Sequence, residues 1–164
     1  MVSAVETLYF SRINSPIGLL TLAVSQRGLV ALEFGAGKVG KGWVESAEKV
    51  APYARQLEEY FAGRRQLFDL PLDLRGTDFQ KRCWRELLKI PYGETRSYAD
   101  IARAMGNPSA VRAVGLANGQ NPIAIIVPCH RVIGSDGSLT GYGGGLESKR
   151  KLLELEGALS GSLV

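Results

Sequence analysis

The local sequence pattern changes near residue 75, and this change limits the folds that the chain can adopt. In residues 7–34, apolar and β-prone residues are interrupted by the turn-forming runs NSP and QRG, which is typical of a hairpin or meander. Beyond residue 75 the chain carries helix-start signals instead. We therefore predict an α/β protein of the α+β kind. Residues 1–75 would form a small antiparallel sheet with a helix, and residues 76–164 a helical lobe.

The first lobe is also expected to contain one helix and two irregular connections. Residues 51–62 carry aromatic and leucine side chains at helical spacing, and Gly63 follows as a stop. The glycine-rich run at 35–43 predicts a loop, and it lacks the final Lys-Ser/Thr pair of a phosphate-binding P-loop. Residues 67–76 predict a strand followed by a connector.

The second lobe opens with two helix-capping patterns. Thr77 and Gln80 match a capping box, and an apolar stripe follows them. Cys83 falls on that stripe, so we interpret it as a core thiol. Ser97 and Asp100 form a second possible capping box, which would open a short helix ending near residue 105.

A turn at 106–108 joins this short helix to another one expected over 109–117. Asn107 can cap the second helix, and Pro108 can take its first helical position. Two short helices joined by a tight turn with glycine suggest a helix-turn-helix, whose second helix would enter DNA. That helix is small on most faces and carries one long cation, Arg112. Ordinary packing of two helices is the alternative, because alanine and glycine also favour close helix contacts.

Positive charge is concentrated around these helices. The chain has a net charge of +4; residues 79–112 carry seven basic against three acidic residues, and residues 1–75 carry nine against eight. A basic segment of this kind suits a polyanion such as nucleic acid, and it is equally typical of a solvated surface. Charge alone leaves both interpretations open.

Cys129 lies beside the only histidine of the chain, in the run IVPCHRV at 126–132. The apolar run 123–127 predicts a buried strand, and Pro128 ends it. A free thiol has a pKa of roughly 8.5, and only the thiolate is a strong nucleophile, so His130 is a candidate base. Because successive side chains of an extended chain point to opposite sides, we expect the base to act through a water.

Two further features could complete a site around this thiol. Glu156 ends a helix expected over 147–156, where a carboxylate opposes the helix dipole but could orient His130. A solvated surface glutamate is the simpler alternative. The run at 134–147 holds six glycines around Tyr142, which suits a pocket wall and equally an ordinary surface loop.

The whole chain excludes several other classes of protein. Two cysteines and one histidine cannot supply a four-cysteine zinc site, nor one of two cysteines with two histidines. A mixed metal site that also uses carboxylates stays open. No apolar stretch approaches the ~20 residues that span a bilayer. The start MVSAVETLYF lacks the features of a secretory signal, so we expect a cytoplasmic protein.

Several motifs now stand in order and at related spacing: IPYGETRSYADIA, AVRAVGLANGQNPIAIIVPCHRVI and GYGGGLESKRKLLELEG. With them the chain resembles the O6-alkylguanine-DNA alkyltransferases, also called methylated-DNA–protein-cysteine methyltransferases. The resemblance is strong over about residues 77–157. It is looser over the first 75 residues, which look like the family's N-terminal lobe. It implies a DNA-binding and alkyl-acceptor domain over 76–164, with a helix-turn-helix resembling a winged helix.

The resemblance implies a role for each residue that matches a family motif. Cys129 would accept the alkyl group from O6 of guanine and keep it. His130 would deprotonate Cys129 through a water, and Glu156 would orient His130. Arg112 would fill the space that the flipped base leaves in the duplex. Tyr98 would lie against the phosphate of the flipped nucleotide and donate a proton as guanine leaves.

The same resemblance implies a substrate- and DNA-binding set. Asn121 would brace the turn between the recognition helix and the active-site loop. Tyr142 would line the pocket, and the backbone of Gly143 would face the oxygen being dealkylated. The set also includes Ser97, Ala110, Gly115 and Val132. The substrate would be double-stranded DNA carrying O6-alkylguanine, and also O4-alkylthymine. The helix-turn-helix would enter this DNA from the minor groove.

The implied reaction is a single, irreversible transfer, because the thioether product has no easy hydrolytic exit. It needs no cofactor and no metal. We expect a monomer in solution, with several copies able to line up on DNA. Some relatives have Pro where this chain has Ala124 and Ser where it has Gly143, which affects the shape of the pocket. Alkyltransferase-like proteins without activity replace the acceptor cysteine, whereas this chain retains Cys129.

Two alternatives remain beside this reading. The first is a DNA-binding regulator whose thiol is incidental or a sensor, and covalent transfer to Cys129 would distinguish it. The second is a thiol hydrolase that uses Cys129 and His130. A hydrolase would turn over repeatedly on an ester or amide and would not depend on Arg112.

Overall fold

The computed structural model describes residues 6–159, and the chain divides into two compact units at the junction of Leu74 and Arg75. The first unit contains a sheet and a helix, and the second is mainly helical. This arrangement confirms the predicted α/β class with an N-terminal sheet. No helix within the described range is long and apolar enough to cross a membrane.

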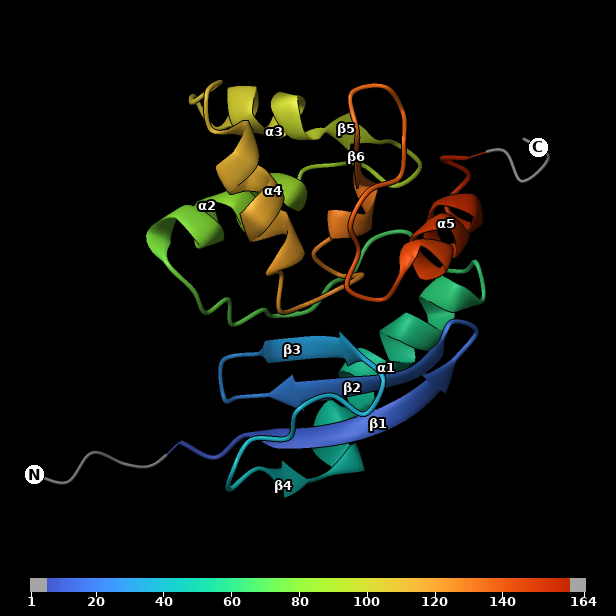
Figure 1. Ribbon diagram of the computed structural model, residues 1–164. Helices are drawn as coiled ribbons and strands as arrows, with labels where there is room; N and C mark the ends of the chain where they lie inside the picture. The colour runs from blue at the N-terminus through green and yellow to red at the C-terminus, as the bar shows by residue number, and fades with distance from the viewer. Residues whose placement is uncertain (1–5, 160–164) are drawn as a thin grey trace, which may run out of the picture. The chain divides into compact units, whose positions relative to one another are not determined.

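The first unit is built on a four-stranded sheet in the order β3-β2-β1-β4 (Figure 1). Its strands are β1 (Tyr9–Ser15), β2 (Gly18–Val24), β3 (Leu29–Phe34) and β4 (Val44–Glu45). The first three form the predicted antiparallel meander, and the tight turn from Ser15 to Gly18 closes its first hairpin. The two-residue strand β4, which pairs parallel with β1, escaped prediction because it follows directly on a glycine-rich loop.

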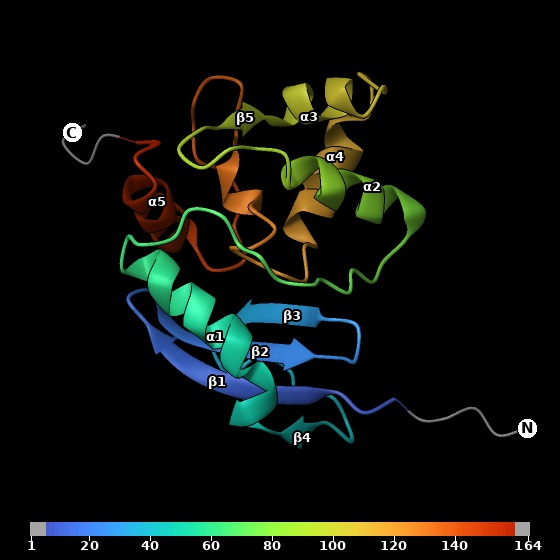
Figure 2. The same cartoon turned by 180° about the vertical axis from the view of Figure 1, so that it is seen from behind.

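Helix α1 (Ala47–Phe61) lies across one face of this sheet, as Figure 2 shows. Its buried side chains recur at helical spacing and are Val50, Tyr53, Leu57 and Tyr60. The helix starts one turn earlier than the predicted residue 51. The Ser46 side chain caps the helix by accepting a hydrogen bond from Lys49 N at 3.2 Å, and Pro52 lies inside the helix.

The strand predicted within residues 67–76 is reduced to a single bridge between Leu29 and Leu72. Leu29 donates to the carbonyl of Pro71 at 3.0 Å, and its own carbonyl accepts from Asp73 N at 2.8 Å. Gly28 precedes this contact with φ 149°, and a Cβ there would lie 2.4 Å from the Pro71 oxygen. Only glycine permits such a close approach of two backbones.

The second unit packs three helices together: α2 (Asp78–Leu87), α3 (Tyr98–Ala104) and α4 (Val111–Gly119). Both predicted capping boxes are present, with Thr77 and Gln80 at the start of α2, and Ser97 and Asp100 at the start of α3. The indole of Trp84 ties α2 to α4 by donating to the carbonyl of Ala117 at 2.9 Å.

Helix α4 begins at Val111, later than the predicted start at 109. Gly106, with φ 77°, turns the chain after α3, and Asn107 accepts the hydroxyl of Ser109 instead of capping the helix. The helix has no side-chain cap, and Pro108 lies in the preceding turn. The predictions that Asn107 caps and that Pro108 opens the helix were therefore wrong.

The remaining elements of the second unit hold the end of the chain. Strand β5 (Arg96–Ser97) pairs parallel with β6 (Val132–Ile133), and helix α5 (Leu146–Leu155) follows a long loop. Both views place the β5–β6 pair between the three packed helices and α5 (Figures 1 and 2). The short 3-10 helix η1 (Cys129–Arg131), which leads into β6, also packs against α5.

Residues 123–127 form a buried turn and not the predicted strand. A short apolar run with no alternation is compatible with either, and here local bonds prevail: Val127 N donates to the carbonyl of Ile123 at 3.0 Å. Ile125 adopts φ 72°, which is unfavourable for a β-branched residue. This strained turn delivers the chain to Cys129.

Candidate active site

Cys129 opens η1 directly after Pro128 and is 5% exposed. Cys83 and Cys129 are both free thiols, and Cys83 lies in the core as predicted. Burial raises the pKa of the Cys129 thiol and outweighs the opposite effects of the Asn121 side chain and of the positive charge of Lys149. The thiol is therefore protonated at neutral pH, and it becomes a nucleophile only when a base removes its proton.

His130 is fully buried and bonded to a carboxylate. Its Nε2 lies 2.8 Å from Oε2 of Glu156, the residue that caps the C-terminus of α5. The same carboxylate accepts the Arg131 guanidinium twice, from Nε at 2.7 Å and from Nη2 at 2.9 Å. Arg131 also donates to the carbonyl of Ile90 at 2.7 Å. Both oxygens of Glu156 are thus held by donors from the segment that carries Cys129.

These contacts set the protonation state of the pair. Burial raises the pKa of Glu156, but hydrogen bonds from His130 and Arg131 and their charges more than offset it and hold the pKa at about 2. Burial likewise lowers the pKa of His130 below 6.5, against the raising effect of Glu156. A neutral imidazole beside an ionised carboxylate donates from Nε2 and keeps its lone pair on Nδ1.

The Nδ1 atom of His130 is buried and has no hydrogen-bond partner within residues 6–159. Buried polar atoms nearly always find a partner, so an unpaired one beside a thiol calls for an explanation. An imidazole nitrogen with a free lone pair can accept a proton, which is what a general base does.

Two further side chains support the loop around Cys129. Asn121 spans the turn before it, because its Oδ1 accepts from Ile123 N at 3.0 Å and its Nδ2 donates to the Val127 carbonyl at 2.8 Å. Lys149 is fully buried, and its Nζ donates to the carbonyls of Val132 at 2.7 Å and Thr140 at 2.8 Å. Asn121 thus braces the turn between α4 and η1, whereas Lys149 ties the end of η1 to the glycine-rich loop.

Burial lowers the pKa of Lys149 to about 8, and the nearby Cys129 raises it. The lysine is therefore mostly charged at neutral pH. The positive charge of Lys149 favours the thiolate form of Cys129 over the thiol.

A hollow of about 530 Å³ lies between the start of α3, one side of α4 and the glycine-rich loop, and its lining includes Tyr98, Gly115, Tyr142 and Gly143. Tyr98 and Thr140 join its two sides through a hydroxyl contact of 3.0 Å. Burial, Cys129 and Glu156 raise the pKa of Tyr142 well above 10, so its phenol stays protonated. Aromatic side chains with glycine backbone make a wall that suits a flat ring.

The profile described as 6-O-methylguanine DNA methyltransferase, DNA binding domain, matches residues 78–158, and that described as its ribonuclease-like domain matches residues 8–74. The chain belongs to the 6-O-methylguanine DNA methyltransferase family. A methylated-DNA–protein-cysteine methyltransferase of Methanosarcina barkeri is 54% identical over 91% of this chain and 97% of its own length. One from Mycobacterium tuberculosis is 56% identical, over 91% and 92%.

Solved structures agree with this membership of the methyltransferase family. The crystal structure of M. tuberculosis OGT in complex with DNA superimposes with a TM-score of 0.87 at 56% identity, covering 92% of this chain and 93% of that one. A structure of the M. tuberculosis O6-methylguanine methyltransferase gives a TM-score of 0.86 at 53% identity, covering 94% and 96%.

The other predicted site residues of this methyltransferase-family chain range from exposed to fully buried. Arg112 is exposed on α4, and Ala110 is half-buried at the start of that helix. The hydroxyl of Ser97 accepts from Asp100 N at 3.0 Å, so it caps α3. Val132 is fully buried, and the structure places its side chain in the core and not on the hollow.

Sequence reasoning missed Arg131 and Lys149. Lys149 and Glu156 share the buried stripe of α5 with Leu152 and Leu153, at spacings of three and four residues. A lysine and a glutamate on an apolar stripe were therefore a visible signal of buried polar contacts. Arg131 offered no such signal beyond its place next to His130.

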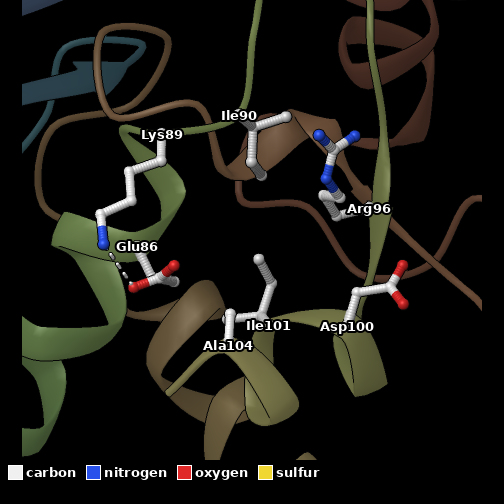
Figure 3. A pocket seen from close by; sticks show the side chains of 7 residues that line it. All are labelled: Glu86, Lys89, Ile90, Arg96, Asp100, Ile101 and Ala104. Carbon is white, nitrogen blue, oxygen red and sulfur yellow. Dashed lines mark hydrogen bonds and ion pairs between the residues drawn. The ribbon is translucent and has the colours of Figure 1, made fainter. Parts of the chain in front are cut away.

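A second hollow, of about 440 Å³, lies on α2 and α3, and its charged side chains already have partners. Figure 3 shows the side chains that line it. Lys89 pairs with Glu86 at 3.1 Å, Arg96 pairs with Glu94 at 3.0 Å, and Asp100 pairs with Arg103. Within the described residues, no group of three or more metal-ligating side chains comes together. The reactive groups of the second unit gather instead around Cys129.

Proposed function

We propose that this protein repairs DNA by moving an alkyl group from O6 of guanine to Sγ of Cys129. Its class follows from its family: it is a methylated-DNA–protein-cysteine methyltransferase. In the transfer the alkyl carbon loses its bond to O6 and gains a bond to sulfur. The thiol proton passes through a water to His130 Nδ1, and the guanine takes a proton from Tyr98 as it leaves. Atoms and charges then balance without a cofactor.

The observation that carries this proposal is the buried chain of contacts from Arg131 to Glu156 to His130. It leaves a neutral imidazole with an open Nδ1 next to a protonated thiol. Attack on an alkyl carbon needs a soft nucleophile, and a thiolate is the softest that a side chain can provide. Proton transfer to His130 creates the thiolate inside the site, where the positive charge of Lys149 stabilises it.

DNA binding is assigned to α3 and α4 as a helix-turn-helix of residues 76–164. The damaged nucleotide would rotate out from the minor-groove side into the hollow beside Tyr98 and Tyr142, because a base inside a duplex cannot reach Cys129. Arg112, exposed on α4, would fill the gap. The structure of a 56% identical relative in complex with DNA supports this assignment. O4-alkylthymine is a second substrate that the same pocket would accept.

The thioether product has no hydrolytic exit, so we expect one transfer for each molecule and no recycling. We also expect a monomer that acts in the cytoplasm on chromosomal DNA, where several copies can line up. The test is transfer from duplex DNA with a labelled O6-methyl group, at several ratios of DNA to protein. The label on protein should level off at one methyl per molecule, whereas continued release of a small product would indicate a hydrolase.

A further inference from the structure

Asn118 occupies an unusual place on α4. It is 3% exposed, and its amide Nδ2 donates to the backbone carbonyl of Cys129 at 3.4 Å. Most other residues of this helix are small or apolar, and its one long cation, Arg112, lies on the exposed face. A polar side chain on the buried face of a DNA-binding helix therefore reaches the residue that accepts the alkyl group.

The other end of this amide has no protein partner. Asn118 Oδ1 and His130 Nδ1 are both buried, and neither has a hydrogen-bond partner among residues 6–159. A buried acceptor left without a hydrogen bond destabilises the fold, so two of them, one on the residue after Cys129 and one on the side chain bonded to the Cys129 carbonyl, call for a partner. Both atoms accept hydrogen bonds, because the Asn118 nitrogen is oriented to the Cys129 carbonyl and the His130 hydrogen to Glu156.

A single water bound beside Cys129 would satisfy both acceptors at once. A water has two hydrogens to donate and oxygen lone pairs that can accept, and a buried water typically makes about three hydrogen bonds. Donating to Asn118 Oδ1 and His130 Nδ1 would leave its oxygen free to accept the Cys129 S–H. Asn118, His130 and Cys129 thus offer the three polar groups that the water carrying the proton would bond.

We propose that Asn118 is a positioning residue of the alkyl transfer, which holds this water between Cys129 and His130. The inference rests on the proposed function and adds to it a residue of the DNA-binding helix. When the thiol proton moves to the water and a water proton moves to Nδ1, the water keeps its bond to Asn118 and stays in place. Loss of Asn118 would leave the water mobile and slow the formation of thiolate without removing the base.

The experiment is single-turnover methyl transfer from duplex DNA with one O6-methylguanine, at saturating protein and from pH 6 to 9. The variants are Asn118→Leu, His130→Ala and the double variant, with Gln120→Leu as a control. Gln120 lies just beyond the same helix and is exposed, with its side chain bonded to Gln80. A general base is worth roughly 10²–10⁴ in rate, so loss of its positioning partner should cost about tenfold.

We expect Asn118→Leu to slow transfer about tenfold, to move the pH–rate profile to higher pH and to leave the Kd for DNA unchanged. In the His130→Ala background the same change should cost almost nothing, because groups that act as one unit are not additive. A full loss in that background, or an unshifted pH profile, would reduce Asn118 to a structural contact and overturn the inference. If wild-type protein takes up no methyl group, the proposed function itself fails.

The unfolding midpoint of each variant shows whether a slower transfer comes from a damaged fold or from loss of the bound water. If Asn118→Leu does not fold, Asn118→Ala replaces it, since its smaller side chain leaves room for a second water in place of the amide. The folded alanine variant should then slow transfer by less than about tenfold relative to wild type and still move the pH–rate profile to higher pH. A folded alanine variant with wild-type rate and wild-type pH dependence would equally refute the role of Asn118.

Discussion

Replacing Glu156 by glutamine removes one negative charge from the centre of the buried network and little else. The carboxylate accepts three hydrogen bonds, one from His130 and two from Arg131. A carboxamide can accept at only one of its two ends, and its NH2 group would face a donor. The Arg131 guanidinium would then keep its bond to the Ile90 carbonyl and one bond to the carboxamide oxygen, and would lack a counter-ion.

The structure indicates the size of this effect in two ways. Removing one partner of a buried ion pair costs ~3–5 kcal/mol. Independently, the pKa of Glu156 is about 2 against an ordinary 4.5, a difference that corresponds to about 3 kcal/mol. For a chain of this length each kcal/mol moves Tm by roughly 2–4 °C, so Glu156→Gln should lower Tm by about 10 °C.

The same pKa gives the sign of the acid dependence. A depressed folded-state pKa stabilises the protein above 4.5, and this stability is lost as pH falls towards 2. The lowered pKa of His130 acts in the same direction from 6.5 downward, because the unfolded chain takes up that proton more readily. Glu156→Gln should therefore flatten the loss of stability below pH 4.5.

The assays are chemical unfolding between pH 3 and 8 and single-turnover methyl transfer, with Glu154→Gln as the control. Glu154 is exposed on α5, and its replacement by glutamine removes the same charge as Glu156→Gln. Without its anionic partner His130 is a weaker base, and we expect transfer about a hundredfold slower with little change in DNA affinity. Equal stability of the two variants, or an unchanged transfer rate in Glu156→Gln, would refute the reasoning.

Three further predictions concern other parts of the protein. Arg112→Ala should slow transfer from duplex DNA at least about tenfold more than transfer from the free modified base, and an equal loss on both substrates would remove its role as a finger. Lys149→Met should raise the pKa of the Cys129 thiol, seen as a shift to higher pH in its alkylation by iodoacetamide followed by peptide mapping, and an unshifted profile would contradict the proposed electrostatic role. Thr77→Ala should cost about 1 kcal/mol through loss of the α2 cap while leaving the transfer rate unchanged, as measured by urea unfolding and the transfer assay.

Elements governed by local chemistry could be predicted from the sequence. The capping boxes at Thr77 and Ser97 depend on residues three positions apart, and both are present. The hairpin turn after Ser15 is equally local. Predictions failed where tertiary contacts decide between alternatives: the apolar run 123–127 became a turn because Asn121 and buried backbone bonds hold it. The start of α4 moved because Asn107 bonds Ser109 instead.

The candidate site divides in the same way. The adjacency of Cys129 and His130 is visible in the sequence, and Glu156 is a candidate partner from its place at the end of a helix. The structure brings the imidazole and the carboxylate together across 26 positions of sequence. The bonds of Arg131 to Glu156 and of Lys149 to Val132 are long-range, so no spacing in the chain announces them.

The most direct test of the account is the intact mass of the protein after mixing with duplex DNA that carries one O6-methylguanine, followed by peptide mapping. The account predicts a single added methyl group on Cys129, none on Cys83, and no addition in Cys129→Ala. Tight binding to the damaged DNA without any change in mass would contradict it, and would leave a protein that recognises the lesion but does not repair it.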